Sequence, residues 1–121
     1  MEENEFFKLI PVRQFDWRLD EQLQRVIVLR PKYLSPWVKK LMSPFSGESH
    51  FKIKLDALGS KVWQACDGQN TVEQVFDILV QAFPEEPELK KRFTLFLKQL
   101  AREKFIVLLQ KVDRETNVRQ G

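Results

Sequence analysis

The stretch from Leu55 to Phe83 constrains the fold most, because residue chemistry marks the ends of two helices within it. Asp56 supplies a carboxylate acceptor at the start of the first helix. Asp67-Gly68 follows that helix, and glycine tolerates the left-handed conformation that is common at helix C-termini. Thr71 and Gln74 have the three-residue spacing of a capping box. The sequence therefore predicts a helix, a tight turn and a second helix.

Apolar residues in both predicted helices recur at spacings of three and four, the period of one helix face. A third segment with the same period follows an acidic, proline-containing connection. The three apolar faces consist of Leu55, Leu58, Val62 and Ala65 or Cys66; of Val72, Val75, Phe76, Leu79 and Phe83; and of Leu89, Phe93, Phe96, Leu97 and Leu100. This pattern predicts three helices that pack around a shared core.

Four other segments have the composition of strands. Apolar and polar residues alternate from Phe15 to Asp20, and residues 25–29 are apolar and rich in β-branched side chains, so we expect a hairpin. Residues 50–55 alternate again and lead into the first helix, and Phe105–Leu109 is a short apolar run. We therefore predict an α+β fold of winged helix-turn-helix type, with a small antiparallel sheet and a three-helix unit.

A chain of 121 residues is expected to form one domain. We place that domain at residues 13–110, after an N-terminal arm (1–12) that packs onto it or frays. The segment 31–49 contains three prolines and reads as an insertion in the domain. The polar residues 111–121 read as a disordered tail.

Reactive residues are few, because the chain has one His and one Cys. These counts exclude a Cys₂His₂ metal site, and no glycine-rich phosphate loop is present. We interpret His50 as a surface residue, Cys66 as a buried small hydrophobe and Trp63 as a core residue. We therefore expect no catalysis and no cofactor. The single Cys and the lack of a long apolar run favour a cytoplasmic protein without a membrane span.

The sequence LDALGSKVWQACDGQNTVEQVF resembles the signature of the PqqD family. The matching positions are Leu55, Asp56, Gly59, Val62, Trp63, Asp67, Gly68, Thr71 and Val72. The resemblance implies a small winged-helix-like protein that catalyses no reaction. Such a protein, also termed a RiPP recognition element, binds the leader of a ribosomally made precursor peptide. It presents that peptide to a modifying enzyme, typically a radical SAM enzyme, as in pyrroloquinoline quinone (PQQ) biosynthesis.

The resemblance also implies a place for the peptide, in a cleft between the third strand and the third helix. An extended peptide would pair with the strand edge and insert alternate side chains into pockets on the helix side. Mapped onto this chain, the peptide-binding residues are Phe51, Lys52, Ile53 and Lys54 on the strand and Lys90, Thr94 and Leu97 on the helix.

The main alternative is a winged-helix DNA-binding regulator, with the third helix as its recognition helix. The basic residues of that helix are Lys90, Lys91, Arg92 and Lys98, but Glu85, Glu86 and Glu88 crowd its start and would repel phosphate. A formal net charge of +3 is too small to argue for nucleic acid. We therefore rank DNA binding below peptide binding, keep an adaptor for another protein segment as a third option, and leave a homodimer open.

Overall fold

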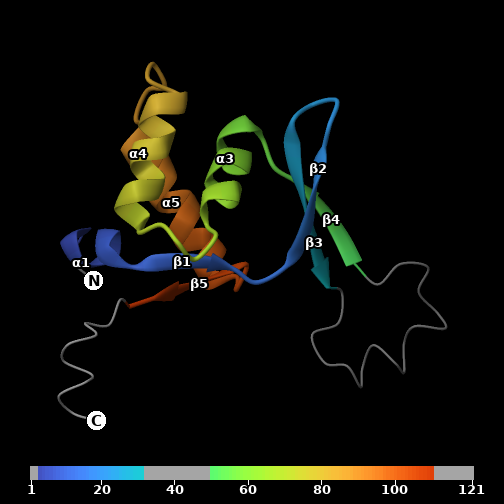
Figure 1. The fold of residues 1–121 in the computed structure, drawn as a ribbon, viewed down its shortest axis with the longest axis horizontal. Coiled ribbons are helices and arrows are strands. Elements are labelled where there is room, and N and C mark those ends of the chain that lie inside the picture. The colour runs from blue at the N-terminus through green and yellow to red at the C-terminus, as the bar shows by residue number, and fades with distance from the viewer. Residues whose placement is uncertain (1–2, 32–49, 111–121) are drawn as a thin grey trace, which may run out of the picture.

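The computed structural model describes residues 3–31 and 50–110 (Figure 1). The elements are α1 (Glu3–Lys8), β1 (Ile10–Arg13), β2 (Asp16–Asp20), β3 (Arg25–Pro31), β4 (His50–Lys54), α3 (Ala57–Ala65), α4 (Val72–Ala82), α5 (Leu89–Arg102) and β5 (Ile106–Leu109). This composition confirms the predicted α+β class. Most of the predicted insertion, and the whole predicted tail, lie outside the described residues.

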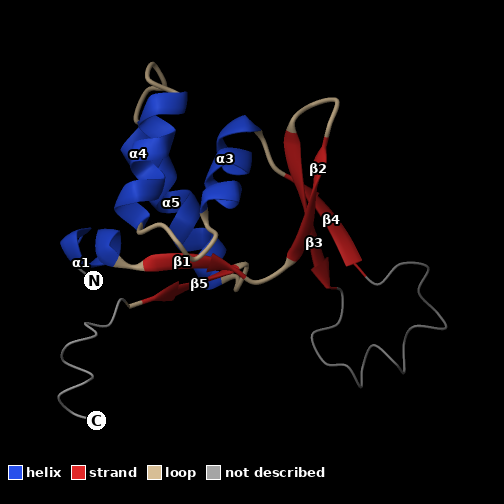
Figure 2. Cartoon of the chain, in the orientation of Figure 1, coloured by secondary structure: helices blue, strands red, loops and turns tan. Residues whose placement is uncertain are grey.

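Strands β2, β3 and β4 form an antiparallel sheet in that order, so the predicted hairpin and third strand are confirmed. Trp17, Val28 and Ile53 lie opposite one another across the three strands. The Asp20 side chain accepts a hydrogen bond from the Gln22 N–H at 3.1 Å in the hairpin turn. Figure 2 shows this sheet on one side of the molecule, with α3 between it and the other helices.

Helices α3 and α4 begin where the capping residues predicted. The Asp56 carboxylate accepts from the Gly59 N–H at 2.7 Å. Thr71 and Gln74 each accept from the other's backbone N–H, which completes the capping box. Between the helices Gly68 has φ +83°, the left-handed conformation that the Asp-Gly pair predicted.

The core lies among α3, α4 and α5 and continues to the three-stranded sheet, where α3 packs against β3. The predicted apolar faces supply it, and its fully buried side chains include Val28, Val62, Trp63, Val72, Val75, Leu79, Phe93 and Leu97. A Cβ atom added to Gly59 would lie 3.2 Å from Cζ of Phe96 on α5. The absence of a side chain at residue 59 therefore lets α5 approach the start of α3 closely.

Residues 3–13 form more structure than the packed or frayed arm that the sequence predicted for residues 1–12. Phe6 on α1 is 2% exposed and belongs to the core. Strand β1 pairs antiparallel with β5, with Ile10 opposite Leu109 and Arg13 opposite Ile106. The Arg13 N–H also donates to the Cys66 carbonyl at 3.1 Å. The N-terminal segment therefore connects the α3–α4 turn to the last strand.

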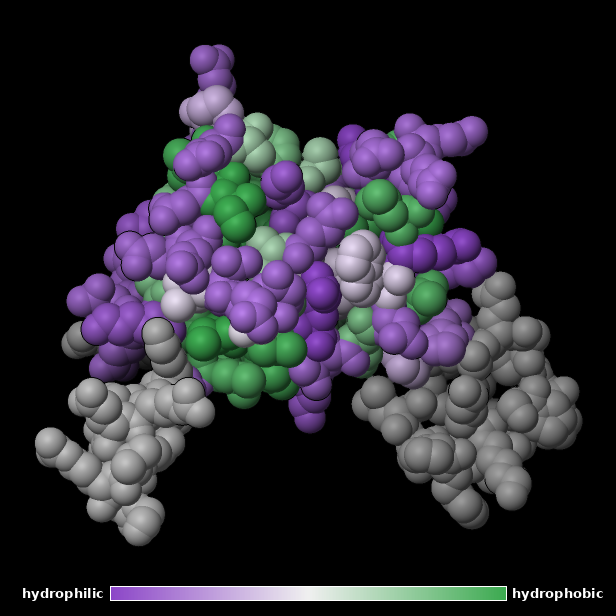
Figure 3. All heavy atoms as spheres, viewed as in Figure 1, coloured by the Kyte–Doolittle hydropathy of each residue, from purple (hydrophilic) through white to green (hydrophobic). Residues whose placement is uncertain are grey.

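Helix α5 ends in a Schellman motif. The Phe105 N–H donates to the Leu100 carbonyl at 2.9 Å, and the Lys104 N–H donates to the Ala101 carbonyl at 3.1 Å. Lys104 occupies the left-handed position of this motif, with φ +66°. Beyond it, the predicted last strand is present as β5, and apolar side chains gather over it on the face drawn in Figure 3.

Candidate functional site

Among the described residues, β4 is the last strand in the order β2-β3-β4. The Leu55 N–H, directly after the strand, donates to the Val26 carbonyl at 2.9 Å. Because the backbone of an antiparallel strand alternates between its two neighbours, the N–H and carbonyl of Ile53 also face β3. Those of Lys54 face the opposite side. The strand therefore directs main-chain groups of Lys54 away from its own sheet.

Ser60 fixes the junction between this strand and the helices. Its hydroxyl accepts from the Val26 N–H at 2.8 Å and donates to the Leu55 carbonyl at 3.3 Å. The residue is 3% exposed, so the bridge is formed out of contact with water. One side chain on α3 thus takes the place of the next ladder bond between β3 and the segment after β4.

The side chains of β4 alternate between two environments. Ile53 lies opposite the fully buried Val28 and packs against the core. Phe51 shares that face but is 51% exposed, because it lies at the other end of the strand. Lys52 and Lys54 are on the opposite face of the sheet and are exposed. The core-facing side of β4 is therefore apolar, and the other side is basic.

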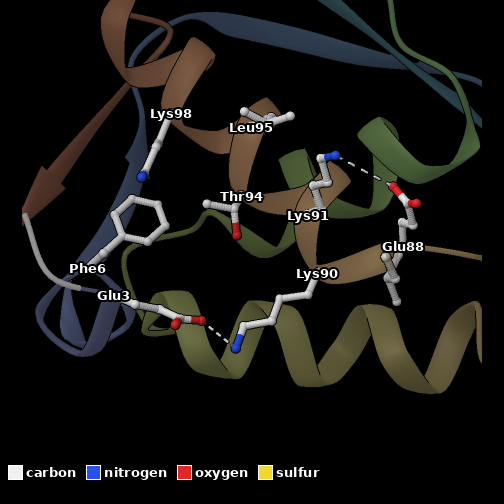
Figure 4. Close-up of a pocket in the computed structure, with 9 residues that line it drawn as sticks. Glu3, Phe6, Glu88, Lys90, Lys91, Thr94, Leu95 and Lys98 are labelled. Carbon is white, nitrogen blue, oxygen red and sulfur yellow. Dashed lines mark ion pairs between the residues drawn. The ribbon is translucent and has the colours of Figure 1, made fainter.

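The helix residues predicted for the site lie in two places, the core and a groove beside α1. Leu97 is fully buried in the core. Lys90 and Thr94 line a groove with α1, where Lys90 forms an ion pair with Glu3 (Figure 4). Successive helix residues are rotated by about 100°, so Thr94 points some 200° away from Phe96.

Phe96 is the α5 side chain that approaches Gly59 and the residues after β4. Lys90 and Thr94 lie on the other flank of α5 from Phe96, and the predicted set of peptide-binding residues stays a prediction. Gly59, which lies within the first predicted helix, was the one sequence signal of this approach. A glycine within a helix indicates that another element approaches closely, but it does not say which residue of that element makes the contact.

The environment of Cys66 does not favour a nucleophilic role for its thiol. The side chain is fully buried, and burial raises the pKa of its thiol to about 12, although Arg13 lowers the value and Asp67 raises it further. The thiolate, which is the nucleophilic form, is therefore negligible near neutral pH. In residues 3–31 and 50–110, no group of three or more His, Cys, Asp or Glu side chains is placed to hold a metal ion.

Carboxylates accompany the basic residues at the start of α5. Lys90 pairs with Glu3, Lys91 lies 3.9 Å from Glu88, and Arg92 pairs with Glu86. All three pairs are exposed enough for water to screen them. They nevertheless place negative charge where a DNA phosphate would approach, which weakens the DNA-binding alternative.

Helices α3, α4 and α5, preceded by a three-stranded antiparallel sheet, define a small α+β protein. The family model for PqqD, described as coenzyme PQQ synthesis protein D, matches residues 41–106, more than half of the chain. The chain therefore belongs to the PqqD family, as its signature predicted, and this membership associates it with coenzyme PQQ synthesis.

The matched region contains β4, α3, α4, α5 and the first residue of β5. The comparisons with curated proteins and with solved structures found no match. Within the part of the chain that the structure describes, no helix is long and apolar enough to cross a membrane.

Proposed function

We propose that this protein is a non-catalytic peptide-recognition protein. It binds the leader of a ribosomally synthesised precursor peptide and presents that peptide to a modifying enzyme, a radical SAM enzyme or another peptide-modifying enzyme. The observation that carries the proposal is the PqqD family match, because it covers both β4 and α5, the two elements of the proposed site. PQQ synthesis is the pathway that the family description names.

The leader binds as an added strand beside β4. Its main chain pairs with backbone groups that face away from β3, those of Lys54 in particular. Pairing of this kind supplies affinity with little dependence on sequence. Specificity then comes from alternate side chains of the peptide, which reach the apolar face of Ile53 and the flank of α5 that carries Phe96.

The basic side chains of β4 favour an acidic leader. Lys52 and Lys54 lie on one face of the strand, where carboxylates of an added strand would come within range. Exposed ion pairs of this type are worth about 0.2–1 kcal/mol each and are screened by salt. They therefore adjust the choice of peptide, whereas the main-chain pairing provides the larger part of the affinity.

Replacement of Lys54 by Pro tests the strand-addition model. The chosen probe is the synthetic leader of a candidate precursor peptide, with affinity measured by calorimetry. Lys54→Pro removes the outward-facing N–H, and its ring obstructs an incoming strand. Loss of a main-chain hydrogen bond costs about 0.5–1.5 kcal/mol, which is about two- to twelvefold in affinity, and the obstruction by the ring adds to it, so we expect binding to weaken about tenfold.

Lys54→Ala is the matched control, because it removes the same charge and keeps the N–H. We expect its affinity to stay within about threefold of the wild type. Urea unfolding of both variants verifies that the sheet is retained. Equal affinities of folded Lys54→Pro and wild-type protein would refute peptide pairing at this edge.

A further inference from the structure

A groove lies on the surface between α1 and α5, on the flank of α5 opposite to Phe96. It is an open groove of about 720 Å³, which is within the range of sites that enclose a drug-sized ligand. Its lining consists of Glu3, Phe6, Glu88, Leu89, Lys90, Lys91, Thr94, Leu95 and Lys98. Figure 4 shows Thr94 near the middle of these side chains, with Leu95 and Lys98 on the same helix beside it.

The groove has an apolar centre. Phe6 is almost fully buried beneath it, and its ring forms part of the wall. Leu95 is 61% exposed, whereas Leu97 and Leu100 on the same helix are buried and Leu89 is half-buried. A leucine held at the edge of a groove in this way offers a contact for an apolar side chain of a partner.

Two lysines of α5 lie on either side of this centre. Nζ of Lys98 lies 5.2 Å from the centroid of the Phe6 ring, and among the described residues no carboxylate pairs with it. Lys91 is only loosely paired with Glu88, at 3.9 Å, and both side chains are largely exposed. Helical spacing places Lys91, Leu95 and Lys98 on one stripe of α5, with the leucine between the two lysines.

We propose that this groove is a second docking site, which takes an acidic segment of a partner protein. An apolar side chain of that segment rests on Leu95, above the buried ring of Phe6, and carboxylates on either side of it reach Lys91 and Lys98. The exposed Leu95 favours a protein segment over DNA, because a phosphate backbone offers no apolar side chain to cover it, and Lys98, which pairs with no carboxylate among the described residues, attracts an acidic one. The site goes beyond leader capture at β4 and does not depend on it.

The test uses the full chain and two synthetic amphipathic helical peptides. One contains only Glu and Leu, and the other has Lys in place of every Glu. Amide NMR signals and the fluorescence anisotropy of labelled peptide report binding. We expect the acidic peptide to shift the Thr94, Leu95 and Lys98 signals saturably, and the basic peptide to leave them unchanged. Lys98→Glu should weaken binding of the acidic peptide about tenfold, since it replaces an attraction with a repulsion.

Lys61→Glu on α3 is the matched control, because it makes the same charge change at an exposed position outside the groove. Its affinity for the acidic peptide should stay within about twofold of the wild type. The proposal is overturned if Lys98→Glu and Lys61→Glu weaken binding of the acidic peptide equally. It is also overturned if the basic peptide binds as well as the acidic one, or if the amide signals of Thr94, Leu95 and Lys98 do not shift. Saturable shifts of the same signals by duplex DNA would also overturn it.

Discussion

Replacement of Ser60 by Ala provides a quantitative test of how the sheet is joined to the helices. The change removes a hydroxyl that accepts from the Val26 N–H at 2.8 Å and donates to the Leu55 carbonyl at 3.3 Å. Both partners then lie next to a methyl group at a position that is 3% exposed. A buried donor left without a partner costs about 1–3 kcal/mol.

We therefore expect Ser60→Ala to lower the free energy of unfolding by about 2 kcal/mol, mainly through the orphaned Val26 N–H. The carbonyl adds less, because its hydrogen bond is longer. Urea unfolding followed by circular dichroism measures the change. The slope of the free energy of unfolding against urea concentration should equal that of the wild type. Native-state hydrogen exchange should be faster at Val26 than in the wild type.

Lys61→Ala is the control for this measurement. Lys61 is the next residue of α3, and it is exposed, so its replacement should change the free energy of unfolding by less than about 0.5 kcal/mol. If Ser60→Ala falls within the same range, the hydroxyl bridge does not join β4 to α3, and the position of the strand has another origin.

Two further predictions concern other sites. Lys104→Gly should raise the free energy of unfolding by about 0.5 kcal/mol, because glycine relieves the cost of φ +66° at the end of α5 but loses more chain entropy on folding; a lower urea midpoint would contradict this. The folded pKa of Cys66, about 12, lies above its ordinary 9.0, so this thiol lowers stability as the pH rises above about 9. Urea midpoints of the wild type should therefore fall more steeply than those of Cys66→Ala between about pH 8 and 10.5, and parallel curves would contradict the assignment.

Local chemistry was sufficient to predict the helices and their ends. Asp56 and the Thr71–Gln74 pair form hydrogen bonds within their own helix termini. Gly68 adopts a left-handed backbone conformation, which glycine tolerates without help from distant contacts. The hairpin was predicted for the same reason, since alternation of apolar residues records which face of a strand is buried. Features of this kind need no knowledge of distant contacts.

The N-terminal helix and strand could not be predicted in this way. Helix α1 has six residues and β1 has four, and β1 contains Pro11. Segments this short carry too few periods to be recognised, and their stability comes from tertiary contacts such as the burial of Phe6 and the pairing with β5. The predicted arm is therefore part of the folded domain because of contacts with β5, almost 100 positions away in the sequence.

The surroundings of α5 could be predicted only in part, for a related reason. The sequence predicted β4 and α5, but the flank of α5 that approaches the start of α3 depends on how the helix is rotated in the core. Lys90 and Thr94 are one flank of its apolar stripe, and Phe96 is on the other. Periodicity defines the buried face of a helix, and it does not say which of the two flanks will adjoin a particular neighbour.

Titration of isotope-labelled protein with the leader peptide tests the central claim most directly. The account predicts saturable shifts of amide signals along β4, largest at Lys54, and at Phe96 on the adjoining flank of α5. It also predicts that hydrogen exchange of the Lys54 amide slows when the peptide is bound, because that N–H gains a partner. Saturable binding that leaves the exchange of Lys54 and the signals of β4 unchanged would contradict the claim that this strand captures the peptide.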